Sequence, residues 1–203
     1  MTPLFSTAFF PPIAYVAALA QYAEAQIEIK ETFPKQTYRN RMHIMTAGGV
    51  RVLTVPVIRN NHSRTEEVLI DYKDRWTVIH LRTLTAAYSA SPYFLYYKDN
   101  IEALLAAAHY DRLIDLNQAT LEWLLRQLKI KCTLTFTTDY QPATTENPSD
   151  FRTIFSPKRP YPTDQFKPYY QVFGDRQPFT PNLSCLDLLM NLGPEAKDYL
   201  KAL

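Results

Sequence analysis

The sequence predicts a single α/β domain, with a mixed sheet, packed helices and a Pro/Tyr-rich C-terminal extension. The chain has 203 residues, a length typical of one domain. Apolar runs with strand periodicity alternate with helical patterns at both ends of the chain, as expected of α/β folds. Of the 15 prolines, 8 lie between Pro142 and Pro181. We therefore expect an α/β core over residues 1–140, followed over 141–203 by a Pro-rich strap and C-terminal helices packed on that core.

The first part of the chain predicts a strand, a helix and a second strand. The apolar run Leu4–Phe10 is typical of a buried strand. Pro11 and Pro12 end this strand, and proline is also tolerated in the first turn of a helix. The Ala-rich segment Ile13–Ala23 is predicted to be that helix. Polar and apolar residues alternate over Gln26–Ile29, as in a strand with one solvent-exposed face.

A β-hairpin is predicted next. Strand character is expected around residues 38–44, and the β-branched run Val50–Val57 alternates as a second strand would. Gly48 and Gly49 lie between the two segments and are a typical hairpin turn signal.

The middle of the chain is predicted to be mainly helical. Four residues spaced four apart fall close to one stripe of a helix: Trp76, His80, Leu84 and Tyr88. Ser91 precedes a proline and should end this helix. A second helix is expected over 94–108, and a third should begin after Asn117, a residue type that often caps helices. The alternating run 131–137 predicts a further strand.

The strap is expected to be extended chain that packs on the core. Disordered segments are poor in aromatic residues, whereas this one contains Tyr161, Phe166, Tyr169, Tyr170, Phe173 and Phe179. The pattern from Ser184 to Asp187 matches a helix N-terminal capping signal. Gly193 can end the helix that follows.

The composition excludes several classes of protein. With only 4 glycines, the chain contains neither a dinucleotide fingerprint nor a Walker A loop. The net charge of +2 is too small for a protein whose main partner is duplex nucleic acid, so we expect no nucleic-acid partner. Cys132 and Cys185 form no CxxC pair and are expected to be buried apolar residues.

The uncharged N-terminal segment lacks the features of a signal peptide and of a membrane span. A signal peptide needs a basic start, but the first Lys or Arg is Lys30. A membrane span needs about 20 apolar residues in sequence, and Pro11 and Pro12 interrupt the run. We therefore expect no membrane insertion and a cytoplasmic location.

The segment from Lys35 to Arg41 is the most informative one for function. On a strand, Arg39 and Arg41 would point to one face and Asn40 to the other. Two arginines on one face can hold a phosphate or carboxylate, with Lys35 adding positive charge. The alternative is a solvated strand face, or structural ion pairs to Glu28 and Glu31. Tyr38 belongs to the same candidate substrate-binding segment. Beside Arg39 it could stack a nucleic-acid base, but one such pair is far from a nucleic-acid-binding platform.

His80 is the second candidate. Histidine titrates near neutral pH and can act as a general base, although a histidine among apolar neighbours is commonly a core residue. Tyr88 lies two helical turns further, so the two side chains cannot share one reacting atom but could line one elongated pocket. The histidines have no metal-binding spacing, so neither a metal nor another cofactor is expected.

Several short motifs follow one another along the chain: Phe10-Pro11-Pro12 with Tyr15; Lys35 to Arg41; Leu53 to Val57; Trp76, His80, Thr83-Leu84 and Ala87-Tyr88; Ser91 to Phe94; Pro181 to Ser184; and Asp187 to Leu189. Together these motifs resemble the WbqC-like protein family, in the form common among Bacteroidetes bacteria. The resemblance covers nearly the whole chain. One departure is that Ala8 and Phe9 stand where many relatives outside this branch carry Gln-Pro.

The resemblance implies a bacterial protein linked to surface-polysaccharide or secondary-metabolite biosynthesis. It favours a transferase that acts on an activated, phosphate-bearing sugar or acyl donor. In this hypothesis Arg39 and Arg41 hold the small-molecule anionic donor, Lys35 neutralises charge, Asn40 orients a polar group and His80 is the general base. The alternative is a non-catalytic binding or assembly protein that uses the Tyr-rich strap as its interaction surface. The sequence does not indicate an oligomeric state.

Overall fold

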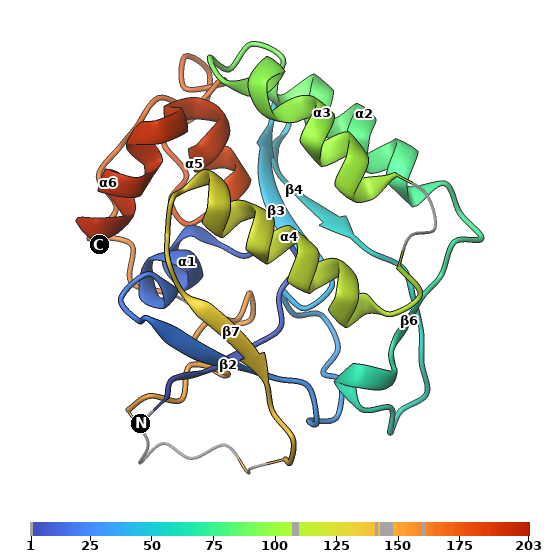
Figure 1. Ribbon diagram of the computed structural model, residues 1–203. Helices are drawn as coiled ribbons and strands as arrows, with labels where there is room; N and C mark the ends of the chain where they lie inside the picture. Colours follow the sequence, from blue (N-terminus) through green and yellow to red (C-terminus); the bar gives the residue numbers. More distant parts are fainter. Residues whose placement is uncertain (1, 107–109, 141, 143–147, 160) are drawn as a thin grey trace.

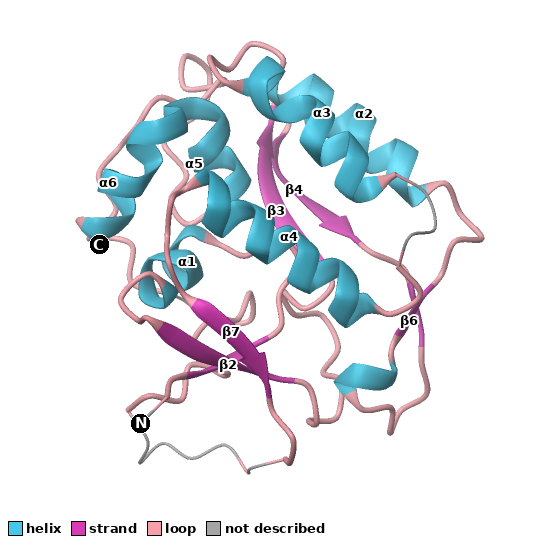
Figure 2. Ribbon diagram, viewed as in Figure 1, coloured by secondary structure: helices cyan, strands magenta, loops and turns pink. Residues whose placement is uncertain are grey.

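A computed structural model describes residues 2–106, 110–140, 142, 148–159 and 161–203 of the chain (Figure 1). It confirms the predicted α/β class, because helices pack around several short strands (Figure 2). The parallel and antiparallel strand pairs lie in separate sheets. No helix in the described ranges is long and apolar enough to cross a membrane.

Three parallel strands form the first sheet, in the order β1 (Leu4–Ser6), β2 (Glu24–Glu28) and β7 (Thr133–Phe136). Leu4 pairs with Gln26, and Glu24 pairs with Thr133. Parallel neighbours need a crossover, and α1 (Ile13–Leu19) supplies it between β1 and β2.

The first strand is shorter than the sequence predicts. Residues 7–10 remain buried but leave the sheet. The backbone N–H of Phe9 donates to the carbonyl of Tyr38 at 2.9 Å instead of to a neighbouring strand. This bond joins the N-terminal segment to the 31–40 loop, so the two motifs lie side by side.

The predicted hairpin is confirmed. β3 (Arg41–Thr46) pairs antiparallel with β4 (Gly49–Thr54), and Gly49 sits at the turn with φ 99°. The expectation that Arg39 and Arg41 share a strand face is wrong. The backbone turns at Gln36, whose φ is 58°, and the strand begins only at Arg41.

Two short elements complete the strand inventory of the described residues. β5 (Val57–Ile58) pairs antiparallel with β6 (Leu69–Ile70), and the 3-10 helix η1 (Thr65–Glu67) lies between them. The Thr65 and Glu66 amides donate to the carbonyls of Glu31 and Ile29, at 2.9 and 3.0 Å. These bonds fix the start of the 31–40 loop against η1.

The helical middle is also confirmed. α2 (Trp76–Tyr88) buries the predicted stripe, and α3 (Phe94–Leu105) lies beside it (Figure 1). The predicted end of the second helix, Ala108, lies outside the described residues. α4 (Leu113–Gln127) runs across the front of the hairpin in the same view.

Asn117 does not cap α4, contrary to the prediction. The helix begins four residues earlier, at Leu113, and Asn117 is a buried residue in its interior. Its side-chain amide donates to Thr7 Oγ1 at 3.0 Å and to the carbonyl of Arg39 at 2.8 Å. Asn117 therefore fixes the 31–40 loop rather than the start of a helix.

The C-terminal helices are α5 (Cys185–Leu192) and α6 (Ala196–Lys201), separated by the 3-10 helix η2 (Gly193–Glu195). The Ser184 hydroxyl accepts from the Leu186 amide at 3.3 Å, which confirms the predicted cap. Gly193 ends α5 with φ 54°, and a Cβ there would come within 2.5 Å of the Tyr93 ring.

Aromatic residues of the strap pack on the parallel sheet. Phe151 stacks on Phe5 of β1 with ring centroids 4.6 Å apart, and Phe155 and Phe166 are buried. Because aromatic side chains bury large areas, these contacts hold the strap against the parallel sheet and the 31–40 loop.

Candidate functional site

A cavity of about 310 Å³ opens between the 31–40 loop and the strap. We call it the basic cavity, because four cationic side chains line it: Arg39, Arg152, Lys158 and Arg159. Glu31 is an acidic residue in the same wall. The loop supplies one side of the cavity and the strap supplies the other, so the packed aromatic residues of the strap set its width.

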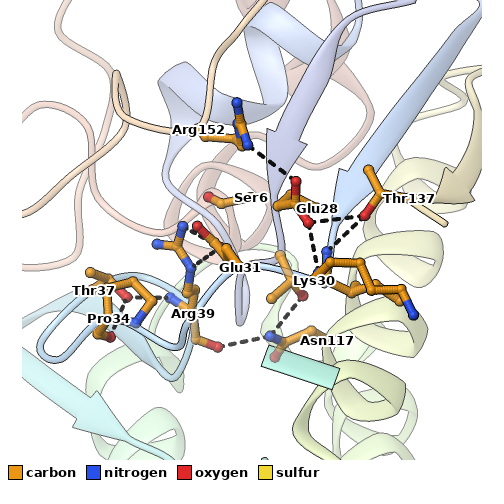
Figure 3. A network of polar contacts seen from close by, with 12 residues as sticks. Ser6, Glu28, Lys30, Glu31, Pro34, Thr37, Arg39, Asn117, Thr137 and Arg152 are labelled. Carbon is orange, nitrogen blue, oxygen red and sulfur yellow. Dashed lines mark hydrogen bonds and ion pairs between the residues drawn. The ribbon is translucent and has the colours of Figure 1, made fainter. Parts of the chain in front are cut away.

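Arg39 is held by Glu31 (Figure 3). Its Nε and Nη2 donate to the same carboxylate oxygen, Glu31 Oε1, at 2.7 and 2.6 Å. Burial raises the pKa of the Glu31 carboxyl, and the Arg39 guanidinium only partly offsets this effect.

A second ion network lies deeper in the same wall (Figure 3). Arg152 Nη1 lies 3.1 Å from Glu28 Oε2, and Arg152 Nη2 lies 2.6 Å from Asp150 Oδ2. Glu28 Oε1 also accepts from the Thr137 hydroxyl at 3.0 Å and from the Lys30 amide at 2.6 Å. All three charged side chains are buried, so this network joins the strap to the end of the parallel sheet.

The charges of the cavity do not cancel completely. Glu31 pairs with Arg39, whereas Glu28 and Asp150 both pair with Arg152. The four cations and three carboxylates therefore sum to a net charge of about +1 when all groups are ionised. Lys158 and Arg159 are exposed, and within the described part of the chain they make no ion pair. The positive charge available to a ligand therefore lies at these two residues.

A second cavity, of about 210 Å³, adjoins the first. Phe155, Ser156 and Arg159 line both cavities. We call the second one the aromatic cavity, because Tyr38, His43, Phe155 and Tyr161 contribute rings to its lining.

Motifs that are far apart in the sequence meet at the aromatic cavity. Pro12 and Pro181 to Leu183 line it together with Tyr38. The Ser184 amide donates to the carbonyl of His43 at 2.8 Å, and the Asn182 Oδ1 accepts from the Ala14 amide at 2.9 Å. The Pro181–Ser184 motif therefore leads into α5 and also contributes residues to the wall of a cavity.

The structure brings together only some of the predicted binding residues. Arg39 lines the basic cavity, Tyr38 lines the aromatic one, and Lys35 is exposed on the same loop. Asn40 is buried and donates to the carbonyl of Val55 at 2.9 Å. Arg41 lies on β3, and its Nε is buried without a hydrogen-bond partner.

His80 and Tyr88 lie outside the lining of both cavities. His80 is 3% exposed, and its ring lies 5.0 Å from that of Trp76 and 6.0 Å from that of Phe9. Burial lowers the pKa of His80 to about 4, although a hydrogen bond to the Thr54 backbone opposes this shift. The hydroxyl of Tyr88 donates to Asp187 Oδ1 at 3.0 Å in a buried cluster.

The family profile of WbqC-like proteins matches residues 7–156, which is most of the chain. The chain belongs to the WbqC-like protein family. It is 29% identical to the uncharacterized protein Rv1507c of Mycobacterium tuberculosis, over 221 aligned residues that cover 95% of this chain and 91% of the relative. No solved structure matches the chain.

The region shared with the WbqC-like family contains both sides of the basic cavity. It includes the Glu31–Arg39 pair and Arg152, but it ends two residues before Lys158. Among the described residues, no group of three or more His, Cys, Asp or Glu side chains is placed to hold a metal ion.

Sequence reasoning missed most of the strap side of this WbqC-family site. Lys158 and Arg159 lie in the predicted Pro-rich strap but were not predicted to bind a ligand, and the network of Arg152 was not predicted. Two adjacent basic residues between prolines were the available signal. Glu31 was considered only as an ion-pair partner, a role it does have towards Arg39.

Proposed function

We propose that this WbqC-family protein is a group-transfer enzyme that binds a phosphate-bearing sugar or acyl donor in the basic cavity. The observation that carries the proposal is the pair of exposed cations, Lys158 and Arg159, which face a cavity that already contains an ordered arginine, Arg39. We place the reaction in surface-polysaccharide or secondary-metabolite biosynthesis, and we also propose the Bacteroidetes-type branch of the family and a cytoplasmic location.

The donor phosphate is bound by side chains in this proposal. Glu31 and Asn117 hold the guanidinium and the carbonyl of Arg39, so the arginine loses little freedom when it binds a ligand. A guanidinium has five N–H groups in a rigid fork, and two of those of Arg39 are used by Glu31. The remaining N–H groups, with Lys158 and Arg159, are available to phosphate oxygens.

Glu31 is the proton acceptor that best fits the cavity. It lines the wall beside Arg39, and its raised pKa brings it closer to neutral pH, which suits a general base. The acceptor hydroxyl or amine attacks the donor carbon, its proton passes to Glu31, and the phosphate-bearing leaving group departs with the bonding electron pair. Arg39 and Lys158 stabilise the charge that develops on the leaving group.

The general-base role of His80 is a competing proposal within the same function. The buried imidazole is neutral at pH 7, because its pKa lies near 4. A proton from a substrate in the basic cavity would have to reach His80 through a change in structure. His80→Gln therefore separates the two proposals: we expect it to keep turnover, whereas Glu31→Gln loses it.

Ligand-induced stabilisation tests the binding step. A panel of nucleotide-sugars, sugar 1-phosphates and acyl-carrier phosphopantetheine is screened by thermal unfolding. A ligand at 100 times its dissociation constant adds about 2.7 kcal/mol to the free energy of unfolding. We expect Arg39→Gln to lose this shift, whereas Arg51→Gln, on the exposed side of β4, keeps it.

Two results would count against the proposal. If no member of the panel stabilises the wild type, the donor site is abandoned. If Arg39→Gln and Arg51→Gln respond alike, the ligand binds elsewhere. Glu31→Gln keeps an acceptor for Arg39, so we expect it to bind the donor and fail to turn it over.

The alternative function, a non-catalytic binding or assembly protein, depends on the strap tyrosines as an interaction surface. Tyr170 is 56% exposed and fits that role. Tyr169 instead donates to the buried carboxylate of Asp187 at 2.5 Å, and Tyr161 packs against Phe155 and Phe166. Binding of a donor without turnover by the wild type, with every candidate acceptor, would favour this alternative.

A further inference from the structure

The two cavities adjoin and are chemically different compartments. Phe155, Ser156 and Arg159 line both of them, so this short segment of the strap is their common border. The basic compartment has a volume of about 310 Å³ and the aromatic one about 210 Å³. Sites for small organic ligands typically have volumes of about 300–1,000 Å³, so one elongated ligand that occupies both compartments is of the expected size.

The aromatic compartment is suited to a flat heterocyclic ring. The Tyr38 ring meets that of His43 edge to face, with centroids 5.2 Å apart, and the Tyr161 ring lies 5.7 Å from that of Phe155. Aromatic side chains stack on nucleobases without regard to base identity. Tyr38 is on the core loop and Tyr161 is on the strap, so the rings come from both sides of the site.

Polar groups at the edge of this compartment match the edge of a base. Asn182 lies in its lining with φ 54°, and its Oδ1 accepts from the Ala14 amide at 2.9 Å. The amide nitrogen of Asn182 is therefore the end that faces away from this bond. Thr180 and Ser156 add hydroxyls to the lining. The Thr180 hydroxyl donates to the carbonyl of Pro178 at 3.5 Å, and the Ser156 hydroxyl accepts from the Lys158 amide at 3.3 Å. Both bonds are long, so a polar occupant can add hydrogen bonds here that an apolar one cannot.

From this arrangement we infer that the donor is a nucleoside diphosphate derivative, with its base in the aromatic compartment and its diphosphate at Arg159, Lys158 and Arg39. This inference rests on the proposed donor-binding function. Arg159 lines both compartments, which is where a diphosphate joined to a nucleoside must lie. A phosphopantetheine arm would present a flexible aliphatic chain to the aromatic rings and would gain no stacking from them.

Calorimetry with three probes on the full chain tests the inference. The probes are uridine diphosphate, inorganic pyrophosphate and 4′-phosphopantetheine. Pyrophosphate contains the diphosphate without a base, and phosphopantetheine contains a phosphate with an aliphatic arm. We expect uridine diphosphate to bind the wild type at least tenfold more tightly than either of the other two.

Two variants test whether the base binds in the aromatic compartment. We expect Tyr161→Ala to weaken uridine diphosphate binding about tenfold and to leave pyrophosphate binding unchanged. Val50→Trp fills the same compartment from the exposed hairpin, because Val50 lines it and is 50% exposed, and it should have the same effect without disturbing the core. Tyr96→Ala, at a 71% exposed position on α3, is the matched control.

Each outcome decides between the proposals. If pyrophosphate binds as tightly as uridine diphosphate, or phosphopantetheine binds more tightly, the nucleoside inference is overturned while the anion site stands. If uridine diphosphate binds more tightly but Tyr161→Ala and Val50→Trp both leave its affinity unchanged, the base lies elsewhere and the inference is again overturned. If none of the three probes binds, the proposed donor site fails together with the inference.

Discussion

Two groups of charged residues on the strap differ in how they are neutralised. Arg152 is buried among Glu28 and Asp150, and its charge is balanced by carboxylates at 3.1 and 2.6 Å. Lys158 and Arg159 are only a few residues further along, yet they are exposed and have no ion pair within the described part of the chain. The first group joins the strap to the sheet, and the second presents charge to a cavity.

The comparison separates structural charges from charges that are available to a ligand. A buried ion that loses its partner is costly because no solvent replaces the lost contact. An exposed cation can be removed at little cost to folding, because water solvates it in the folded and unfolded states alike. The strap therefore carries an anchor and a binding element within a few residues of each other, and substitutions can test the two roles separately.

The largest expected effect is on the anchor. Arg152→Met should lower the free energy of unfolding by about 3–5 kcal/mol, because it leaves Glu28 and Asp150 as buried carboxylates without their cation. Urea denaturation measures this change. The control is Arg176→Met, which removes an exposed pair with Asp175 on the same strap and should change stability by less than about 1 kcal/mol. Equal effects of the two variants would show that burial does not distinguish them.

His80 extends the comparison to a buried base without a counter-charge. Between pH 6.5 and about 4 the unfolded chain binds a proton at His80 and the folded protein does not. The free energy of unfolding therefore falls as the pH falls through this window, by on the order of 3 kcal/mol from this residue. His80→Gln should reduce the slope of stability against pH there, whereas His62→Gln, at an exposed position, should not. An unchanged slope in His80→Gln would mean that His80 is protonated in the folded protein.

How far the sequence could predict the fold depended on whether the signal was local. The stripe of Trp76 and His80, the hairpin glycines and the Ser184 cap are short-range patterns, and all three are confirmed. Asn117 was misplaced, because its preference for caps is local while its actual partners, Thr7 and the carbonyl of Arg39, are far away in the sequence.

The candidate site was less predictable for the same reason. The charge of the 35–41 segment identified it as a candidate binding segment. Which of its side chains share a face could not be predicted, because the alternation rule applies to a strand and the backbone turns at Gln36 before β3 begins. The opposite wall comes from the strap, more than 110 residues away along the chain. No local pattern places Arg159 and Arg39 in the wall of one cavity, since this depends on how the strap packs against the sheet.

The smallest expected effect on stability belongs to the exposed cations. The double variant Lys158→Ala/Arg159→Ala should change the free energy of unfolding by no more than about 0.5 kcal/mol, because both residues are exposed and neither has an ion pair with a described residue. The same variant should weaken pyrophosphate binding and flatten its dependence on salt concentration, since fewer charges remain to be screened. Urea denaturation and calorimetry between low and physiological salt measure both quantities on one sample. A loss of stability comparable to that of Arg152→Met would show that these cations anchor the strap and would remove the distinction between its two groups of charges.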